Sequence, residues 1–119
     1  MAWRIEEYRT AAGETPVRTF IAGLPADAKA KAIALIKLAE TLGNKLREPH
    51  SKALGDGLFE LRRNQVRLFY MFEPGQIIRL LGGMVKKQDR IPADVLAQMR
   101  GYQKDERERL KKAKTEKKR

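Results

Sequence analysis

The sequence predicts a small α+β domain, in which an antiparallel sheet of about four strands carries two N-terminal helices on one face and is followed by a C-terminal helix. Three features predict this class. Apolar residues recur at helical spacing in the first half, they alternate at strand spacing in the second half, and tight-turn residues separate the strand-like runs. We expect residues 1–103 to form the domain and residues 104–119 to form a basic extension that is helical or disordered.

The first half supplies one strand and two helices. Residues 3–9, WRIEEYR, alternate apolar and polar side chains as a short strand does. Residues 15–23 begin with Thr-Pro, a good helix start, and end in glycine, so they predict a short helix. Residues 25–44 open with proline and close with Gly-Asn, and we expect a longer helix there. Its inward face consists of Ala28, Ala32, Leu35, Ile36, Ala39 and Leu42.

The second half is typical of an antiparallel meander. After a loop at residues 44–57, three strands are expected: LFELR at 58–62, VRLFYMFE at 66–73 and IIRLLGGMVKK at 77–87. Arg-Asn-Gln and Pro-Gly separate these strands, and both are tight-turn sequences. Pro92 then opens the last helix, whose apolar side chains pack back on the sheet. Those side chains are Val95, Leu96, Met99 and Tyr102.

The chain carries 26 lysines and arginines against 15 aspartates and glutamates, a net charge of +11. The excess is +2 up to residue 57, +4 from residue 58 to 103, and +5 in residues 104–119. Such a charge indicates a polyanionic partner, either nucleic acid or an anionic membrane face. The lack of cysteine excludes disulfides and thiolate metal sites, and the single histidine and scattered acids match no metal-ligand spacing. With no membrane-spanning run and no signal peptide, we expect a cytoplasmic protein.

The first hairpin indicates an anion site. A two-residue turn at Asn64-Gln65 sets its register and places Arg62 directly opposite Arg67. Like charges that face each other across two strands are destabilising, and a bound anion removes that cost. Glu60 is the only acid on the same face that is available to neutralise the pair.

The second hairpin is expected to add to this surface. The Pro-Gly turn predicts Arg67 opposite Gly82, so that the missing side chains at Gly82 and Gly83 leave open space beside the arginine. Lys86 and Lys87 close the same strand. The group suits a phosphate, because arginine offers a planar fork of donors and lysine a point charge. The alternative is that the arginines simply cover an exposed sheet face and that the glycine pair marks a bulge.

The segments LFELR, VRLFYMFE and IIRLLGGMVKKQDRIP resemble the signature of HigB-type toxins in the RelE/ParE superfamily, particularly its phage-related branch. The resemblance covers residues 3–101 and is strongest over residues 58–92. It implies a RelE-like fold and a small bacterial or phage-derived toxin that cleaves mRNA, usually in the ribosomal A site, and is neutralised by a helix-turn-helix antitoxin of the HigA type. The implied reaction is attack of an RNA 2′-hydroxyl on the adjacent phosphate, without a metal ion or another cofactor.

Carried over by position, the resemblance assigns catalytic roles to Arg62, Arg67 and Lys87. Two positions depart from the pattern. Glu60 stands where RelE has a second lysine, and Ala93 stands roughly where RelE has a catalytic tyrosine. These departures do not affect the assignment of the arginines and the lysine as phosphate-binding groups. They leave open which groups transfer protons.

A wider basic set is expected to contact the RNA: Arg63, Lys86, Arg90, Lys52 and His50. Strict alternation along the last strand puts Lys86 on the arginine face, whereas the resemblance favours Lys87, and a bulge at the glycine pair reconciles the two. Either lysine can act as a base, because neighbouring cations lower the pKa of an ammonium group. His50, the only histidine, is either an acid or base of the reaction or an exposed loop residue.

Two other functions are compatible with the sequence. One is a non-catalytic, ParE-like inhibitor of DNA gyrase on the same fold, and the other is a general RNA- or DNA-binding module in which residues 104–119 do most of the binding. The cationic sheet face favours the nuclease over the gyrase inhibitor, because ParE-like members generally lack the full cationic set. We expect the basic extension to contact either ribosomal RNA or the antitoxin.

Overall fold

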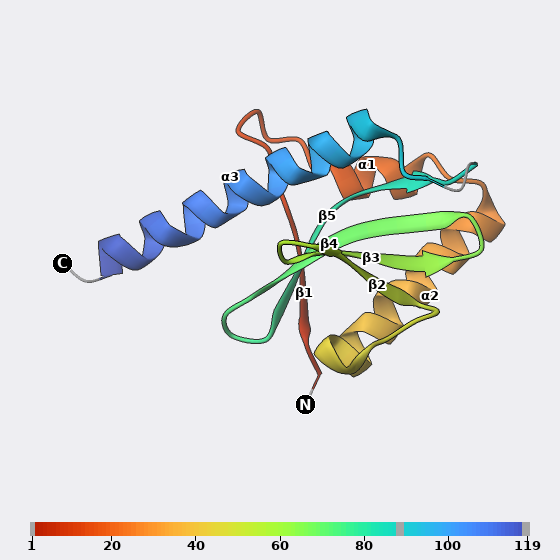
Figure 1. The fold of residues 1–119 in the computed structure, drawn as a ribbon, viewed down its shortest axis with the longest axis horizontal. Helices are drawn as coiled ribbons and strands as arrows, with labels where there is room; N and C mark the ends of the chain where they lie inside the picture. The colour runs from red at the N-terminus through yellow and green to blue at the C-terminus, as the bar shows by residue number, and fades with distance from the viewer. Residues whose placement is uncertain (1, 88–89, 118–119) are drawn as a thin grey trace.

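The computed structural model describes residues 2–87 and 90–117. Within them, a five-stranded sheet lies between helices on both of its faces (Figure 1). The elements are β1 (Arg4–Glu7), α1 (Pro16–Ala22), α2 (Ala26–Leu42), the 3-10 turn η1 (Gly43–Lys45), β2 (Ser51–Gly55), β3 (Leu58–Arg63), β4 (Val66–Glu73), β5 (Ile77–Val85) and α3 (Ala93–Lys117). The α+β class is confirmed.

The sheet differs from the expected one in size and in the direction of one strand. Its order in the described residues is β1-β5-β4-β3-β2. Strand β1 runs parallel to β5, whereas each of the other neighbouring pairs is antiparallel. The prediction of about four antiparallel strands was therefore wrong, because the direction of β1 depends on long-range pairing that local patterns do not carry.

Strand β2 lies where the sequence predicted a loop. Its residues, SKALG, include no β-branched or aromatic side chain, so local propensity does not indicate a strand. Pairing with β3 decides the conformation, since Ser51 faces Leu61 and Ala53 faces Phe59 in an antiparallel ladder. Backbone hydrogen bonds to the neighbouring strand thus build an element that single-sequence patterns miss.

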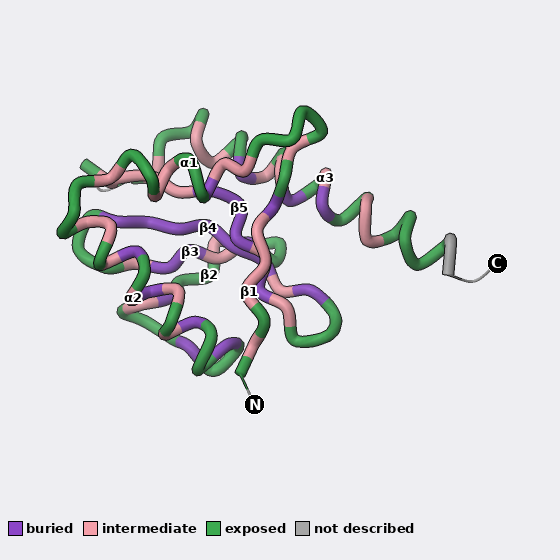
Figure 2. The backbone as a smooth tube through the Cα atoms, turned by 180° about the vertical axis from the view of Figure 1, so that it is seen from behind, coloured by how far each residue is buried: buried purple, intermediate pink, exposed green. Residues whose placement is uncertain are grey.

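Each face of the sheet has its own apolar core. Helices α1 and α2 cover one face, with Val17 and Leu35 in that core, and α3 covers the other face with Met99. Strand β4 runs through the middle and is buried almost throughout (Figure 2), as a strand covered on both faces should be. The placement of the two N-terminal helices on one face is confirmed. Leu42, which was expected in this core, ends α2 at its margin and is 37% exposed.

The two hairpins differ in how well their registers were predicted. Arg62 faces Arg67 across β3 and β4, as the two-residue turn predicted. Between β4 and β5 the turn contains three residues, Pro74–Gln76, of which the last two have positive φ (88° and 57°). Phe72 consequently pairs with Ile78, whereas the register that puts Arg67 opposite Gly82 pairs it with Ile77.

Helix α3 runs without a break across residue 104, where the extension was expected to begin. Residues 111–115 are exposed, and this end of the helix projects beyond the sheet (Figure 1). The division into a domain and an extension stays a prediction, and residues 118–119 of that extension lie outside the described residues. None of the helices within the described ranges combines the length and the apolar composition that a membrane crossing requires.

Polar groups attach the middle turns of α3 to the sheet. The Tyr8 hydroxyl donates to Asp105 (2.6 Å), and burial together with this bond raises the pKa of Tyr8 to about 12. The next residue, Glu106, lies 3.2 Å from Nε of Arg79 on β5. The sequence did not predict this attachment, because residues 104–110 contain a single large apolar side chain, Leu110.

Candidate functional site

A pocket of about 500 Å³ opens at the turn of the β3–β4 hairpin. Its lining consists of Pro49, His50, Arg62, Arg63, Asn64 and Arg67. Sheet pairing explains the grouping: the Arg62 N–H donates to the His50 carbonyl (2.8 Å), and Arg62 faces Arg67 on the next strand. Residues that face each other across neighbouring strands project on the same side of a sheet. His50, Arg62 and Arg67 therefore form one row at a cationic pocket.

Arg67 is held in place by the turn of its own hairpin. Its Nη1 donates to the carbonyl oxygens of Asn64 (2.7 Å) and Val66 (3.0 Å), and the residue is only 7% exposed. Burial lowers the pKa of the Arg67 guanidinium; the Glu60 carboxylate opposes this shift, and Arg62 adds to it. Because a guanidinium stays charged in proteins, the site presents a fixed positive charge.

A buried carboxylate lies between the two facing arginines. Glu60 is 2% exposed, and its Oε1 is 3.5 Å from Nε of Arg62 and 4.0 Å from Nε of Arg67. Nη1 of Arg62 also lies 4.0 Å from Glu48, which is on the surface. Among the described residues, neither Glu60 Oε2 nor Arg67 Nε finds a hydrogen-bond partner. The sequence placed Glu60 on this face, but its burial depends on how the chain folds around it, which no local pattern reports.

The other candidates lie around the pocket rather than in its lining. Lys86 follows the end of β5, and its N–H donates to the Gln65 carbonyl at the hairpin turn (2.7 Å). Lys87 and Arg90 are exposed farther along the chain. Lys52 is exposed on β2, two residues after His50, and pairs with Glu60. The structure thus brings four of the eight predicted site residues together in the pocket lining and leaves these four outside it.

Two lining residues, Pro49 and Asn64, were not among the predicted site residues. Asn64 was recognised as a turn residue, and its positive φ of 53° agrees with that role. Its carbonyl holds Arg67, a contact that depends on the arginine rotamer. Turn position was therefore the only sequence signal for Asn64, and it did not reveal the contribution to the site.

The glycine pair does not open space beside Arg67. The three-residue turn and a bulge in β5 each shift the ladder by one residue, so that Arg67 faces Met84 instead of Gly82. A Cβ at Gly82 would lie 2.9 Å from the Met99 side chain of α3, and one at Gly83 would collide with an aromatic ring of α1. The pair lets both helices approach β5, where it borders a cavity of about 320 Å³ between them. The expected open patch at the arginines was wrong.

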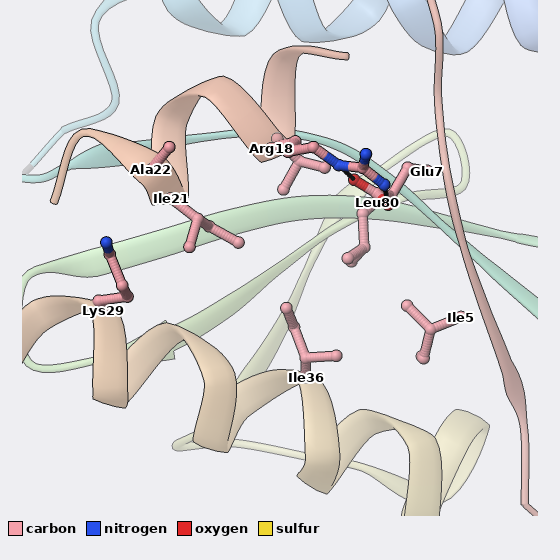
Figure 3. Close-up of a pocket in the computed structure, with 9 residues that line it drawn as sticks. Ile5, Glu7, Arg18, Ile21, Ala22, Lys29, Ile36 and Leu80 are labelled. Carbon is pink, nitrogen blue, oxygen red and sulfur yellow. Dashed lines mark hydrogen bonds and ion pairs between the residues drawn. The ribbon is translucent and has the colours of Figure 1, made fainter.

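A further cavity, of about 360 Å³, lies between α1, α2 and β1 (Figure 3). Isoleucines from all three elements line it, and Figure 3 shows Arg18 beside Glu7 at one side. These two side chains pair at 2.7 Å and neutralise each other, which leaves Lys29 as the remaining charged group of the lining. The cavity lacks the converging cations that bind a phosphate. The hairpin pocket is therefore the stronger candidate site.

The chain was compared with known families, curated proteins and solved structures. A family model described as Phage derived protein Gp49-like (DUF891) matches residues 19–118, whereas no curated protein matches. Among solved structures, the chain is similar to one chain of the toxin-antitoxin complex RelBE2 from Mycobacterium tuberculosis, with 21% identity and a TM-score of 0.48; the similarity covers 72% of this chain and 100% of that chain. Because the family match spans more than half of the sequence, the chain belongs to the Gp49-like family of phage-derived proteins.

Proposed function

We propose that the protein is a HigB-type toxin of a type II toxin–antitoxin pair and that it cleaves mRNA on the ribosome. The family supports the toxin class. The observation that carries the nuclease is the row of His50, Arg62 and Arg67 at one pocket. A strand of RNA presents phosphates, and a pocket lined by three arginines attracts them.

The proposed reaction is attack of the RNA 2′-hydroxyl on the adjacent phosphate, which forms a 2′,3′-cyclic phosphate and releases a 5′-hydroxyl. Arg67 suits the stabilisation of the phosphorane, because its guanidinium is already fixed before the substrate binds. Arg62 faces it and supplies a second planar donor. Neither arginine can serve as a base. His50 is the lining residue whose type ordinarily exchanges protons near neutral pH, so we assign the proton transfer to it.

Lys87 and the remaining basic residues take a different part in the proposal. Lys86 and Lys87 follow β5 at the hairpin end of the sheet, and Arg90 is exposed beyond them. Lys52 flanks the pocket on the other side. Because these side chains lie outside the lining, we propose that they contact phosphates on either side of the scissile one, and Lys87 stabilises the reaction from that distance.

The exposed end of α3 supplies a second basic surface. Lys104, Lys111 and Lys114 are exposed, and spacings of seven and three residues place them on one side of the helix. This end of α3 and the β3–β4 hairpin lie at opposite ends of the molecule (Figure 1). We propose that the pocket holds the mRNA while the helix contacts a separate stretch of ribosomal RNA. The proposed neutralising partner is a helix-turn-helix antitoxin of the HigA type.

The variant Arg62→Ala tests the nuclease. Its side chain is 31% exposed and its ion-pair contacts are at 3.5 Å or more, so its removal should leave the fold intact. We expect growth arrest to be lost and cleavage to fall by at least about 100-fold. The 5′ ends of cellular mRNA are sequenced after induction, with and without translation. Cuts inside codons that disappear when translation is blocked support cleavage on the ribosome.

Two further variants make the comparison specific. Arg18→Ala removes an exposed arginine from α1, away from the pocket, and should leave the cleavage pattern unchanged. Arg67→Ala should abolish cleavage and also destabilise the fold by roughly 1–3 kcal/mol, because two carbonyls lose a charged donor. An unchanged cleavage pattern in Arg62→Ala contradicts the proposed site.

A further inference from the structure

Two buried carboxylates on the same sheet face bind arginine in different ways. Glu73 accepts two hydrogen bonds from Arg79, one from Nε and one from Nη2, each 2.8 Å long. Glu60 Oε2 has no hydrogen-bond partner in the part of the chain that the structure describes, and Oε1 lies 3.5 Å from Arg62 and 4.0 Å from Arg67. The chain therefore forms a fully bonded pair at one end of the face and a loose group at the pocket.

The two arginines at Glu60 differ in their freedom to move. The Arg67 side chain is 9% exposed and is fixed by two backbone carbonyls. The Arg62 side chain is 31% exposed and lines the pocket, and its ion pairs within the described residues are contacts of 3.5 Å with Glu60 and 4.0 Å with Glu48. Contacts of this length give up little when a side chain turns toward a better acceptor.

Building on the phosphate pocket of the proposed function, we propose that Glu60 is a positioning residue that holds Arg62 as an internal counter-ion and releases it to an incoming phosphate. A phosphate offers several oxygens to a planar guanidinium and forms short, charge-assisted hydrogen bonds with it. Arg62 then exchanges a loose contact for a bidentate one, and Glu60 stays beside Arg67 and balances its charge. Before the phosphate binds, Glu60 limits the repulsion between the two facing arginines.

This arrangement makes the pocket selective for phosphate over monatomic anions. A monatomic anion such as chloride cannot engage the two donors of a guanidinium fork as a phosphate does, so it competes poorly with the carboxylate for Arg62. The internal carboxylate also reduces the positive charge that the pocket offers to any anion. Glu60 thus lowers the affinity for all anions and lowers it least for phosphate.

Titration with inorganic phosphate tests this role without RNA cleavage. The full chain is compared with Glu60→Gln, which keeps the side-chain shape and removes the competing charge. We expect the variant to bind phosphate about tenfold more tightly at low chloride and to lose part of its discrimination against chloride. Glu40→Gln makes the same charge change at an exposed position of α2, and its affinity should stay within about twofold of the unaltered chain.

Nuclear magnetic resonance of the arginine Nε–Hε groups shows which guanidinium responds. In the unaltered chain, bound phosphate should shift the Arg62 signal strongly and the Arg67 signal slightly, with Arg62→Lys used for assignment. An equal or weaker phosphate affinity in Glu60→Gln overturns the proposal, as does an Arg62 signal that ignores bound phosphate. The signal measurement needs no Glu60 variant, so it decides the question even if Glu60→Gln fails to fold. Phosphate binding with the expected pattern but without RNA cleavage supports the counter-ion and refutes the nuclease.

Discussion

Glu106→Gln should stabilise the protein at pH 8 and change its stability little at pH 5. Glu106 attaches α3 to the sheet, is 6% exposed, and shares Arg79 with Glu73. The pKa of Glu106 is raised from 4.5 to about 7, with burial as the largest cause; the neighbouring Glu73 carboxyl also raises it, whereas Arg79 and Arg109 lower it. One arginine bound tightly by Glu73 leaves the second buried carboxylate poorly compensated.

The direction and the size of this stability change follow from the linkage between proton binding and folding. Between pH 4.5 and about 7 the folded protein keeps a proton on Glu106 that the unfolded chain has released. The stability contribution is complete below pH 4.5 and is lost as the pH rises through about 7. The difference between 4.5 and about 7, at about 1.36 kcal/mol for each pKa unit, sets an upper limit of roughly 3 kcal/mol, and solvent screening reduces it to about 1–2 kcal/mol.

Urea unfolding at both pH values measures this difference. The glutamine resembles the protonated side chain and leaves the Glu73–Arg79 pair neutral. The free energy of unfolding of the variant should therefore exceed that of the unaltered chain by about 1–2 kcal/mol at pH 8 only. Glu108→Gln, an exposed position on the same helix, is the matched control and should show no such pH dependence. The same difference at pH 5 and pH 8, or a less stable Glu106→Gln at pH 8, refutes the reasoning.

Two further predictions concern α3 and the glycines. Replacing Lys111 and Lys114 together by glutamine should weaken binding to long ribosomal RNA and flatten its salt dependence by about 1–2 in slope, with cleavage of a short oligonucleotide unchanged; equal slopes contradict the contact. Gly83→Ala should lower the free energy of unfolding by roughly 1–3 kcal/mol, because the new Cβ meets the Phe20 ring and a backbone carbonyl of β4. Gly101→Ala should raise it by about 0.5–1 kcal/mol, since nothing lies within 4 Å and alanine favours the helix. Urea unfolding compares the two, and a loss in both would contradict the packing argument.

Local sequence patterns predicted correctly the parts of the fold that depend on interactions between neighbours along the chain. The Asn64-Gln65 turn and the alternation on both sides of it were enough for the register of the first hairpin. The second hairpin was misjudged because Gln76 takes a positive φ that a non-glycine residue rarely adopts, which lengthens the turn by one residue. Strand β2 and the parallel pairing of β1 depend on partners distant in the sequence.

The candidate site divides in the same way. The Arg62–Arg67 pair followed from the hairpin register and is present. The predicted open space at Gly82 is filled, because helices from both faces pack on β5 and a bulge shifts its pairing. Sequence alone could not decide whether His50 lies at the reaction site or in an exposed loop. Its place beside Arg62 comes from the ladder that β2 continues, and β2 was itself not predicted.

The contrast between the two buried glutamates indicates how one sheet face can serve stability and binding at once. Glu73 and Arg79 lie at the β4–β5 turn, where α3 must be held, and their hydrogen bonds are complete. Glu60 lies toward the opposite turn, beside the pocket, where its Oε2 and the Nε of Arg67 have no hydrogen-bond partner among the residues described. Incomplete pairing has a cost in stability, yet it keeps a guanidinium available for an anion. The apolar core and the tight pair under α3 can offset that cost, so the loose pairing is placed at the end of the face where a phosphate can enter.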